Sequence, residues 1–175
     1  IDMVANAFYA AGVRKNDVVI FCMVNMPETV YSLYALNKLG AVVNLVDLRT
    51  NEQQMQTYVQ ECNAQYVLTV DFAYPVIEKA LRGSHVKKKI VVSPGESLRG
   101  IKKAAYSIKT FGNNVDKHVL SWKNFVRLGK DGQAKTAKYE KEKCFIIAHT
   151  GGTTGIPKGV MLSDDNINSV AHGYL

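Results

Sequence analysis

One segment of the sequence is rich in residues that bind anions. Residues 149–159 read His-Thr-Gly-Gly-Thr-Thr-Gly-Ile-Pro-Lys-Gly. Glycines let the backbone pass close to an anion, and exposed N–H groups and threonine hydroxyls donate hydrogen bonds to phosphate oxygens. The lysine adds a mobile positive charge. The candidate phosphate-binding residues are therefore Thr150, Gly151, Gly152, Thr153, Thr154, Gly155 and Lys158.

This loop differs from the two common nucleotide-binding motifs. In a P-loop, Gly-Lys is followed by Ser or Thr at the start of a helix, whereas Lys158 lies between Pro157 and Gly159. Residues 160–162 are apolar and predict a strand instead of that helix. Two of the glycines are adjacent, so the spacing of the Rossmann fingerprint also fails. The sequence therefore disfavours a kinase or phosphatase of the P-loop type.

Alternating strands and helices are predicted on the amino-terminal side of the loop. The continuous apolar run 18–24 is typical of a strand buried on both faces, and Pro27 and Gly40 mark the two ends of a helix. This alternation predicts a layered, mostly parallel α/β sheet with flanking helices. Further predicted strands are 41–46, 65–70, 89–92, 144–149 and 160–162; predicted helices are 3–11, 27–39, 51–62 behind a Thr50 cap, 73–81, and one from Asp164 onward. The predicted apolar face of helix 27–39 consists of Val30, Leu33, Tyr34, Leu36 and Leu39.

The chain is predicted to be a single incomplete domain, 1–175, with a loop-rich basic segment at about 93–142. Turn residues surround a predicted helix 98–109, and Ser121 is expected to cap a short helix that contains Phe125. The low apolar content of this segment indicates a connection over the surface instead of a second domain. The non-methionine start and the abrupt end indicate a piece of a longer polypeptide.

Positive charge is concentrated in the middle of the chain. The net charge is +7, from 22 basic and 15 acidic residues, and 16 of the basic but only 5 of the acidic residues lie at 82–143. Such a segment attracts nucleic acid, an anionic membrane surface or a phosphate-rich cofactor. Aromatic residues do not alternate with the lysines, so no nucleic-acid partner is predicted and a solvated surface is favoured. Weak contact of Lys87, Lys88 and Lys89 with an anionic membrane stays a hypothesis.

The cysteines and histidines carry no sign of a metal site. Cys22, Cys62 and Cys144 are odd in number and far apart, in apolar or helical settings, which predicts reduced core side chains and a cytoplasmic protein. The four histidines have no ligand spacing with one another or with the cysteines, so no metal-binding residues are predicted in this chain. No apolar run reaches about 18 residues, so no membrane-spanning helix is predicted.

The glycine- and threonine-rich loop, its Pro-Lys-Gly ending and the strands beside it resemble the phosphate-binding signature of the adenylate-forming superfamily. Residues 12–20, 25–28 and 38–44 also resemble the first part of the large domain of AMP-forming acyl-CoA synthetases, whereas the basic middle is poorly matched. Family members often have tyrosine where His149 stands and serine where Gly151 stands. A glycine pair at this point is familiar among fatty-acyl-CoA synthetases.

The resemblance implies the ATP-dependent activation of a carboxylic acid, expected to be a fatty acid. The acid and ATP give an acyl-adenylate and pyrophosphate, and the thiol of coenzyme A then displaces AMP to give acyl-CoA. ATP, Mg²⁺ and coenzyme A are the implied cofactor and co-substrates. Thr150, Thr153, Thr154 and Lys158 would stabilise the charge that builds up on the phosphates, and the three glycines would let the loop close.

The resemblance also implies that these 175 residues are inactive alone. In the family, the contacts to adenine and ribose, the Mg²⁺-binding carboxylate, the acyl pocket and a catalytic lysine lie beyond the matched region. The remainder of the same polypeptide is thus an implied partner. The alternative is a non-catalytic nucleotide- or anion-binding module from a truncated relative, which would use the same loop without the reaction.

Overall fold

The computed structural model describes residues 1–94, 119–151 and 157–173. The strands in these ranges are β1 (Val18–Cys22), β2 (Val42–Leu45), β3 (Tyr66–Val70), β4 (Lys88–Val92), β5 (Val119–Ser121), β6 (Cys144–His149) and β7 (Gly159–Ser163). The helices are α1 (Asp2–Ala11), α2 (Pro27–Leu39), α3 (Glu52–Glu61), α4 (Tyr74–Ala80), α6 (Trp122–Leu128) and α7 (Asp164–His172). The sequence predicted all of these elements except β5, and wherever it predicted an end, that end differs by no more than two residues from the observed one. The predicted helix 98–109 lies outside the described residues.

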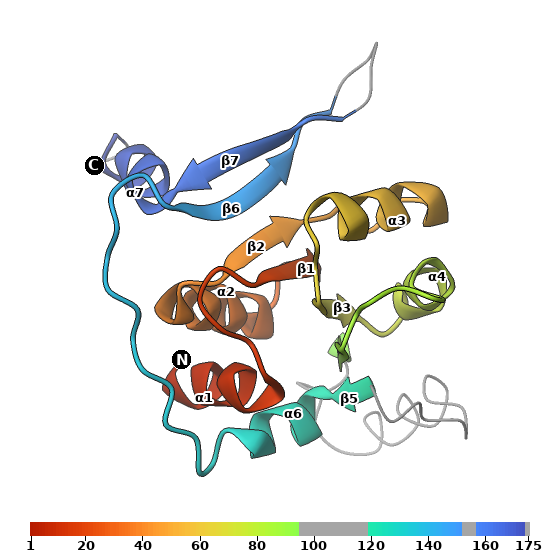
Figure 1. The fold of residues 1–175 in the computed structure, drawn as a ribbon, viewed down its shortest axis with the longest axis horizontal. Helices are drawn as coiled ribbons and strands as arrows, with labels where there is room; N and C mark the ends of the chain where they lie inside the picture. Colours follow the sequence, from red (N-terminus) through yellow and green to blue (C-terminus); the bar gives the residue numbers. More distant parts are fainter. Residues whose placement is uncertain (95–118, 152–156, 174–175) are drawn as a thin grey trace.

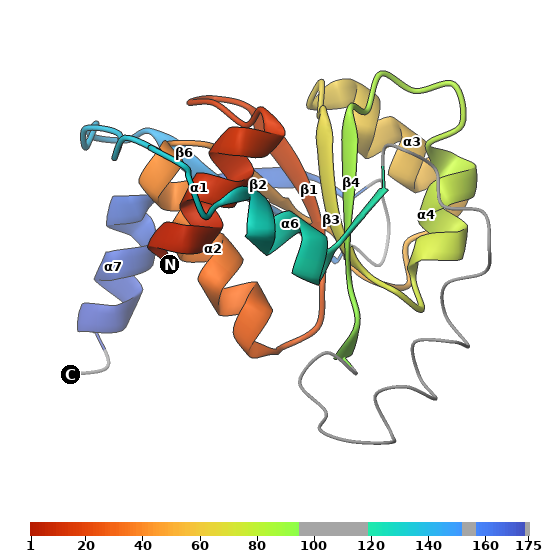
Figure 2. The same cartoon turned by 90° about the horizontal axis from the view of Figure 1, so that it is seen from below.

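The strands form one sheet in the order β5-β4-β3-β1-β2-β6-β7 (Figure 1). Each pair of neighbours is parallel except the last, in which β7 runs antiparallel to β6. Helices α1, α2 and α6 cover one face and helices α3 and α4 cover the other (Figure 2). The predicted layered, mostly parallel α/β sheet with flanking helices is confirmed.

Strand β1 lies in the middle of the sheet and contributes to the core on both faces. Val19 and Phe21 pack with the apolar residues of α1, α2 and α6, whereas Ile20 and Cys22 pack with those of α3 and α4. Successive side chains of a strand point to opposite faces, so a strand between two helix layers needs an unbroken apolar run. The interpretation of 18–24 as a strand buried on both faces is confirmed for the residues of β1.

The predicted apolar face of helix α2 is only partly right: Leu36 and Leu39 are buried and Leu33 packs against the core, but the other two predicted residues are not buried. Val30 and Tyr34 are 49% and 60% exposed. The buried residues of α2 are Glu28, Ser32, Ala35, Leu36 and Leu39. Ser32 and Ala35 have small side chains, and both are fully buried, so α2 can pack closely against α1. Hydrophobicity alone favoured the larger side chains, whereas close packing of two helices selected the smaller ones.

Helix α3 begins one residue later than predicted, and Asn51 is its N-cap instead of Thr50. The Asn51 side chain accepts a hydrogen bond from the backbone N–H of Gln54 at 2.9 Å. This contact is typical of an N-cap, which satisfies an N–H group that the first turn leaves unpaired. Asn51 makes this contact because it lies directly before Glu52, the first residue of the helix.

The part of the basic segment that the structure describes joins the main sheet and core. β5 adds an edge strand beside β4, and the predicted Ser121 cap of α6 is confirmed by its hydrogen bond from the Asn124 N–H. Phe125 is fully buried, and its ring meets that of Phe8 edge-on at 4.7 Å. The surface connection predicted from composition therefore carries one core residue.

All three cysteines are free; Cys22 is buried, and Cys62 and Cys144 are half-buried. Among the described helices, none is both long and apolar enough to cross a membrane.

Candidate functional site

The topology brings two chain segments to the same end of the sheet. β2 and β6 are parallel neighbours, with Leu45 opposite Ala148. The residues that follow β2 therefore lie beside the residues that follow β6, which is where open α/β sheets bind their ligands. Helix α3 begins a few residues after β2 and lies at this end as well (Figure 1).

A cleft of about 440 Å³ lies at this end of the sheet. Its walls come from the segment after β2, from α3 and from the loop between β6 and β7. The lining residues are Asp47, Arg49, Thr50, Gln54, Tyr58, His149, Thr150, Gly151 and Pro157. Two of the predicted phosphate-binding residues, Thr150 and Gly151, thus belong to a shared cleft with residues that are distant in sequence.

The ends of the glycine-rich loop are held together at its base. The Thr150 N–H donates to the carbonyl of Lys158 at 3.0 Å, and the Lys158 N–H donates to Thr150 Oγ1 at 3.3 Å. The predicted arrangement of strand, loop and strand is confirmed, since β6 and β7 form an antiparallel pair. Thr150, Gly151 and Lys158 are exposed. Gly152, Thr153, Thr154 and Gly155 lie outside the described residues.

Thr150 also has a role that the sequence did not predict. Its hydroxyl oxygen accepts from the Lys158 N–H and so closes the base of the loop. Lys158 forms no ion pair among the described residues, and its side chain is exposed beside the loop. The lysine is therefore placed to meet an anion, whereas the first threonine fixes the width of the loop at its base.

The last residue of β6, His149, is held by two other elements. Its Nε2 atom lies 2.7 Å from Oδ1 of Asn44 in β2, and its ring stacks on Tyr58 of α3 at 3.9 Å between centroids. Asn44 is fully buried, and its amide donates to Cys62 Sγ at 3.2 Å. Burial lowers the pKa of His149, and the weaker influence of Glu61 acts in the opposite direction.

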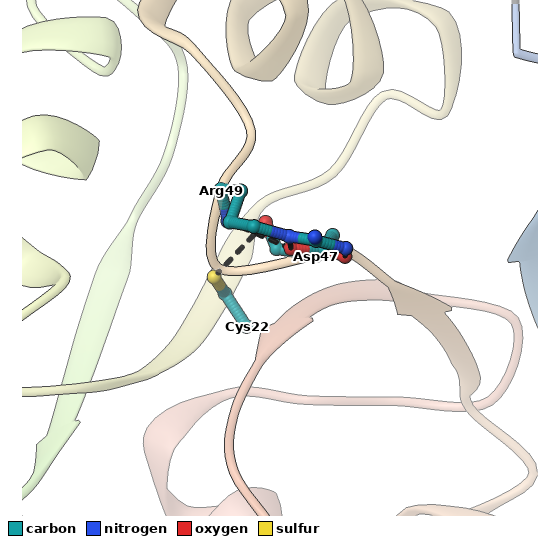
Figure 3. Close-up of polar contacts among 3 residues, drawn as sticks. All are labelled: Cys22, Asp47 and Arg49. Atoms are coloured by element: carbon teal, nitrogen blue, oxygen red, sulfur yellow. Dashed lines mark hydrogen bonds and ion pairs between the residues drawn. The ribbon is translucent and has the colours of Figure 1, made fainter. Parts of the chain in front are cut away.

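On the opposite wall, Asp47 and Arg49 form a two-pronged ion pair (Figure 3). Arg49 Nε donates to Asp47 Oδ1 at 3.0 Å, and Nη2 donates to Oδ2 at 2.7 Å. Hydrogen bonds from the Arg49 side chain and backbone hold the pKa of Asp47 at about 2. The Arg49 side chain is 90% exposed, so its guanidinium can still receive an anion from solvent.

A buried thiol contacts the chain segment that forms this wall. Cys22 Sγ donates to the carbonyl of Asp47 at 3.9 Å (Figure 3). Burial raises the pKa of Cys22 to about 11, so the thiol keeps its proton at neutral pH and can act as a donor. The contact links the end of β1 to the segment that carries Asp47 and Arg49.

No cluster of metal ligands accompanies the cleft in the described parts of the chain. Residues 1–94, 119–151 and 157–173 contain no group of three His, Cys, Asp or Glu side chains that could hold a metal ion. Asp47 lines the cleft, but Arg49 already occupies both of its oxygens. These residues do not fit the Mg²⁺ that the resemblance implies.

Sequence reasoning found the loop but missed the opposite walls of the cleft. Asp47, Arg49 and Tyr58 were not singled out, and His149 was noted only as a departure from related sequences. One signal was present: polar residues follow the predicted strand 41–46, and parallel strands gather their carboxyl ends at one edge. The sequence did not show that β2 is the neighbour of β6.

A family model for AMP-binding enzymes matches residues 1–174. The chain belongs to the AMP-binding enzyme family. It is 28% identical over 90% of its length to the acetyl-coenzyme A synthetase of Streptomyces coelicolor. It is 27% identical over 95% of its length to the crotonobetaine/carnitine–CoA ligase of Proteus mirabilis, and 26% identical over 89% to the long-chain-fatty-acid–CoA ligase of Bacillus subtilis.

Solved structures of acid–CoA ligases share the fold of this chain. An anthranilate CoA ligase in complex with anthranoyl-AMP superposes with a TM-score of 0.71 at 22% identity, covering 91% of this chain and 27% of the ligase. A long-chain-fatty-acid-CoA ligase from Archaeoglobus fulgidus has a TM-score of 0.72 at 21% identity, covering 99% of this chain and 30% of that ligase. The chain spans only 24%, 30% and 29% of the three curated relatives named above. The resemblance to the first part of an acyl-CoA synthetase is confirmed.

Proposed function

We propose that this chain supplies the phosphate-binding part of an AMP-forming acid–CoA ligase. The observation that carries the proposal is that Thr150, Gly151 and Pro157, from the two described ends of the segment between β6 and β7, line the cleft at the carboxyl ends of parallel strands. Membership of the AMP-binding enzyme family supports it, as do relatives that are named as ligases of acids with coenzyme A.

The proposed reaction has two steps. A carboxylate oxygen attacks the α-phosphorus of ATP, the bond to the β-phosphate oxygen breaks, and pyrophosphate leaves with the bonding electrons. The sulfur of coenzyme A then attacks the acyl carbon, its proton is released, and AMP departs. The anthranoyl-AMP bound to a structurally similar ligase is an intermediate of this type.

The residues of this chain would act mainly in the first step. Negative charge moves onto the departing pyrophosphate, so donors and cations beside it lower the energy of the transition state. We assign that role to Lys158, Thr153, Thr154 and Thr150, with Gly151, Gly152 and Gly155 allowing the loop to close around the phosphates. Arg49 adds a second cation at the opposite wall of the cleft.

We propose a fatty acid as the substrate, ATP and coenzyme A as co-substrates, and Mg²⁺ as the ion that accompanies ATP. The glycine pair at 151–152 and the fatty-acid ligase among the relatives support the substrate class. The other relatives are named for acetate and for carnitine derivatives, so the test must include acids of several kinds. Because the described residues do not fit a metal ion, no step is assigned to Mg²⁺ here.

We also propose a cytoplasmic enzyme that makes weak contact with anionic membranes. Three free cysteines support a reducing compartment, and the basic segment supports the membrane contact. Changing Lys87, Lys88 and Lys89 to Gln together is expected to weaken binding to anionic vesicles. Unaltered vesicle binding would remove the support for this contact.

The test is carboxylate-dependent exchange of labelled pyrophosphate into ATP, measured on the complete gene product that contains residues 1–175. Fatty, aromatic and amino acids are compared as substrates. Lys158→Ala is expected to lower the exchange rate by about a hundredfold, because a cation that meets the developing charge is lost. Thr154→Ala is expected to lower the rate by a smaller factor.

Lys130→Ala is the matched control, since Lys130 is an exposed lysine far from the cleft lining. This variant should exchange pyrophosphate as the unaltered protein does. Exchange that requires a fatty acid establishes the adenylation step and the substrate class together. A folded protein that shows no exchange with any acid supports the non-catalytic binding module instead.

A further inference from the structure

His149 joins three elements directly before the loop. It is the last residue of β6, it immediately precedes Thr150, and its ring contacts Asn44 of β2 and Tyr58 of α3. Asn44 lies in a fully buried position between His149 and Cys62, with a contact to each. The ring is therefore a fixed connection between the end of β6 and the two elements that form the other walls of the cleft.

Hydrogen bonding determines which ring nitrogen carries the proton. His149 Nδ1 is buried and has no hydrogen-bond partner in the described structure. If Nδ1 carried the proton, a buried N–H would be left without an acceptor, which folded proteins rarely tolerate. The alternative places the proton on Nε2, where it is donated to Asn44 Oδ1 at 2.7 Å, and leaves only a lone pair unpaired. The ring is thus neutral and in the Nε2–H form.

The surroundings of the ring oppose a second proton. On the β7 side, Nδ1 faces Gly159, at which an added Cβ would lie 3.7 Å from this atom. Among the described residues, none accepts a hydrogen bond from Nδ1, and Lys158 immediately precedes Gly159 in the chain. From β2 the ring meets the neutral amide of Asn44.

On the α3 side, the ring stacks on Tyr58, while Cys62 contacts Asn44 and Glu61 influences the ring by its charge. Burial raises the pKa values of both Tyr58 and Cys62, so neither is charged at neutral pH. Glu61 favours the protonated ring, but it is exposed, and burial of the imidazole outweighs it and lowers the pKa of His149. Protonation would keep the Nε2–H donor to Asn44 but would add a buried Nδ1–H that no described acceptor receives, so it would weaken the fixed position of the ring.

We propose that His149 is a positioning residue of the phosphate loop, which fixes the end of β6 through Asn44 and Tyr58 and so places Thr150 at the cleft. This inference rests on the proposed function, in which the loop binds the phosphates of ATP. The imidazole does not touch the reacting atoms. Its neutral form keeps Thr150 at the cleft, and its protonation weakens that placement.

Binding of pyrophosphate to the complete gene product tests the role, by titration calorimetry between about pH 7.5 and about pH 5, where histidine changes charge. His149→Phe keeps an aromatic ring for Tyr58 but cannot donate to Asn44, so its affinity at about pH 7.5 should fall about five- to tenfold. His149→Gln keeps an N–H donor that does not titrate. Its affinity at about pH 7.5 should stay within about threefold of the unaltered protein.

Dividing the affinity of the unaltered protein by that of His149→Gln at the same pH cancels the effect of the titration of pyrophosphate itself. As the pH falls, the unaltered protein should lose more affinity than His149→Gln, so the ratio between them should change by about tenfold. His172→Gln is the matched control, because His172 is exposed at the end of α7. This variant should follow the unaltered protein at every pH.

A ratio that stays constant with pH, or a His149→Phe variant that binds like the unaltered protein, overturns the role of His149. The ¹⁵N chemical shifts of the imidazole in the unliganded protein give a second test that needs no ligand. They should report the Nε2–H form at neutral pH, and an Nδ1–H form overturns the inference directly. An unaltered protein that binds no pyrophosphate overturns the proposed function itself, and the chemical shifts distinguish the two failures.

Discussion

At the scale of single residues, the Asp47–Arg49 pair offers a prediction about pH. The pKa of Asp47 is about 2, chiefly because the Arg49 side chain and backbone donate hydrogen bonds to its carboxylate. In Arg49→Gln the side-chain ion pair is lost but the backbone donor stays, so the pKa should rise part of the way to its ordinary value of 3.8. A ¹³C NMR titration of the carboxyl carbon measures this change.

The sign of the effect on stability follows from the lowered pKa. A carboxyl whose pKa is depressed by folding stabilises the protein above its unfolded pKa of about 4, and this contribution is lost as the pH falls to about 2. Lys38→Gln is the control, because Lys38 pairs with Asp2 elsewhere in the structure. That variant should raise the pKa of Asp2 and leave Asp47 unchanged. An Asp47 pKa that stays the same in Arg49→Gln would show that the Arg49 side chain does not lower it.

The residues of the site were partly predictable from the sequence. Thr150 and Lys158 stood out because glycine, hydroxyl and ammonium groups occur within one short segment, and the pattern is local. Asn44 acts through His149, which is 105 residues away in sequence, and Arg49 lines the same cleft as the similarly distant Thr150. Such contacts depend on which strands pair, and no local pattern determines that order.

At the scale of the elements, the strands were predicted more accurately than the details of the helices. An apolar run buried on both faces identifies a strand almost by itself, as in β1. The face that a helix buries depends on its neighbour, so Val30 and Tyr34 were misplaced. The strand β5 has three residues and lies at the edge of the sheet, so it carries little periodicity to detect.

The cap of α3 provides a prediction at this scale, since α3 carries Gln54 and Tyr58 into the cleft. Asn51→Ala removes the acceptor of the Gln54 N–H, so the first turn should open more often and that amide should exchange about five- to tenfold faster. Native-state hydrogen exchange of the Gln54 amide is the measurement. Thr50→Ala is the adjacent control and should leave the exchange rate within about twofold, because Thr50 does not cap the helix. Equal effects of the two variants would show that the Asn51 cap does not hold the first turn.

At the scale of the whole molecule, the sheet determines where the cleft can form. Parallel strands bring the segments after β2 and β6 to one end, and the antiparallel strand β7 returns the chain from the loop. Helices on both faces fix these strands through two apolar clusters. The cleft thus has walls from three parts of the chain that are distant in sequence.

Residues 1–175 produced alone should bind pyrophosphate but should hardly release AMP. They span only 24% and 30% of the first two curated relatives, and the resemblance implies that the adenine, acyl and catalytic-lysine contacts lie outside the matched region. The isolated chain is therefore expected to bind pyrophosphate, which needs only the loop, and to release AMP at least about a thousandfold more slowly than the complete gene product. Hydrogen-exchange protection of β1 and β3, whose side chains are almost all buried, first establishes that the isolated chain is folded. Binding without AMP release assigns phosphate recognition to this part of the protein. AMP release at the rate of the complete protein contradicts the prediction, because it would place the entire catalytic apparatus within these residues.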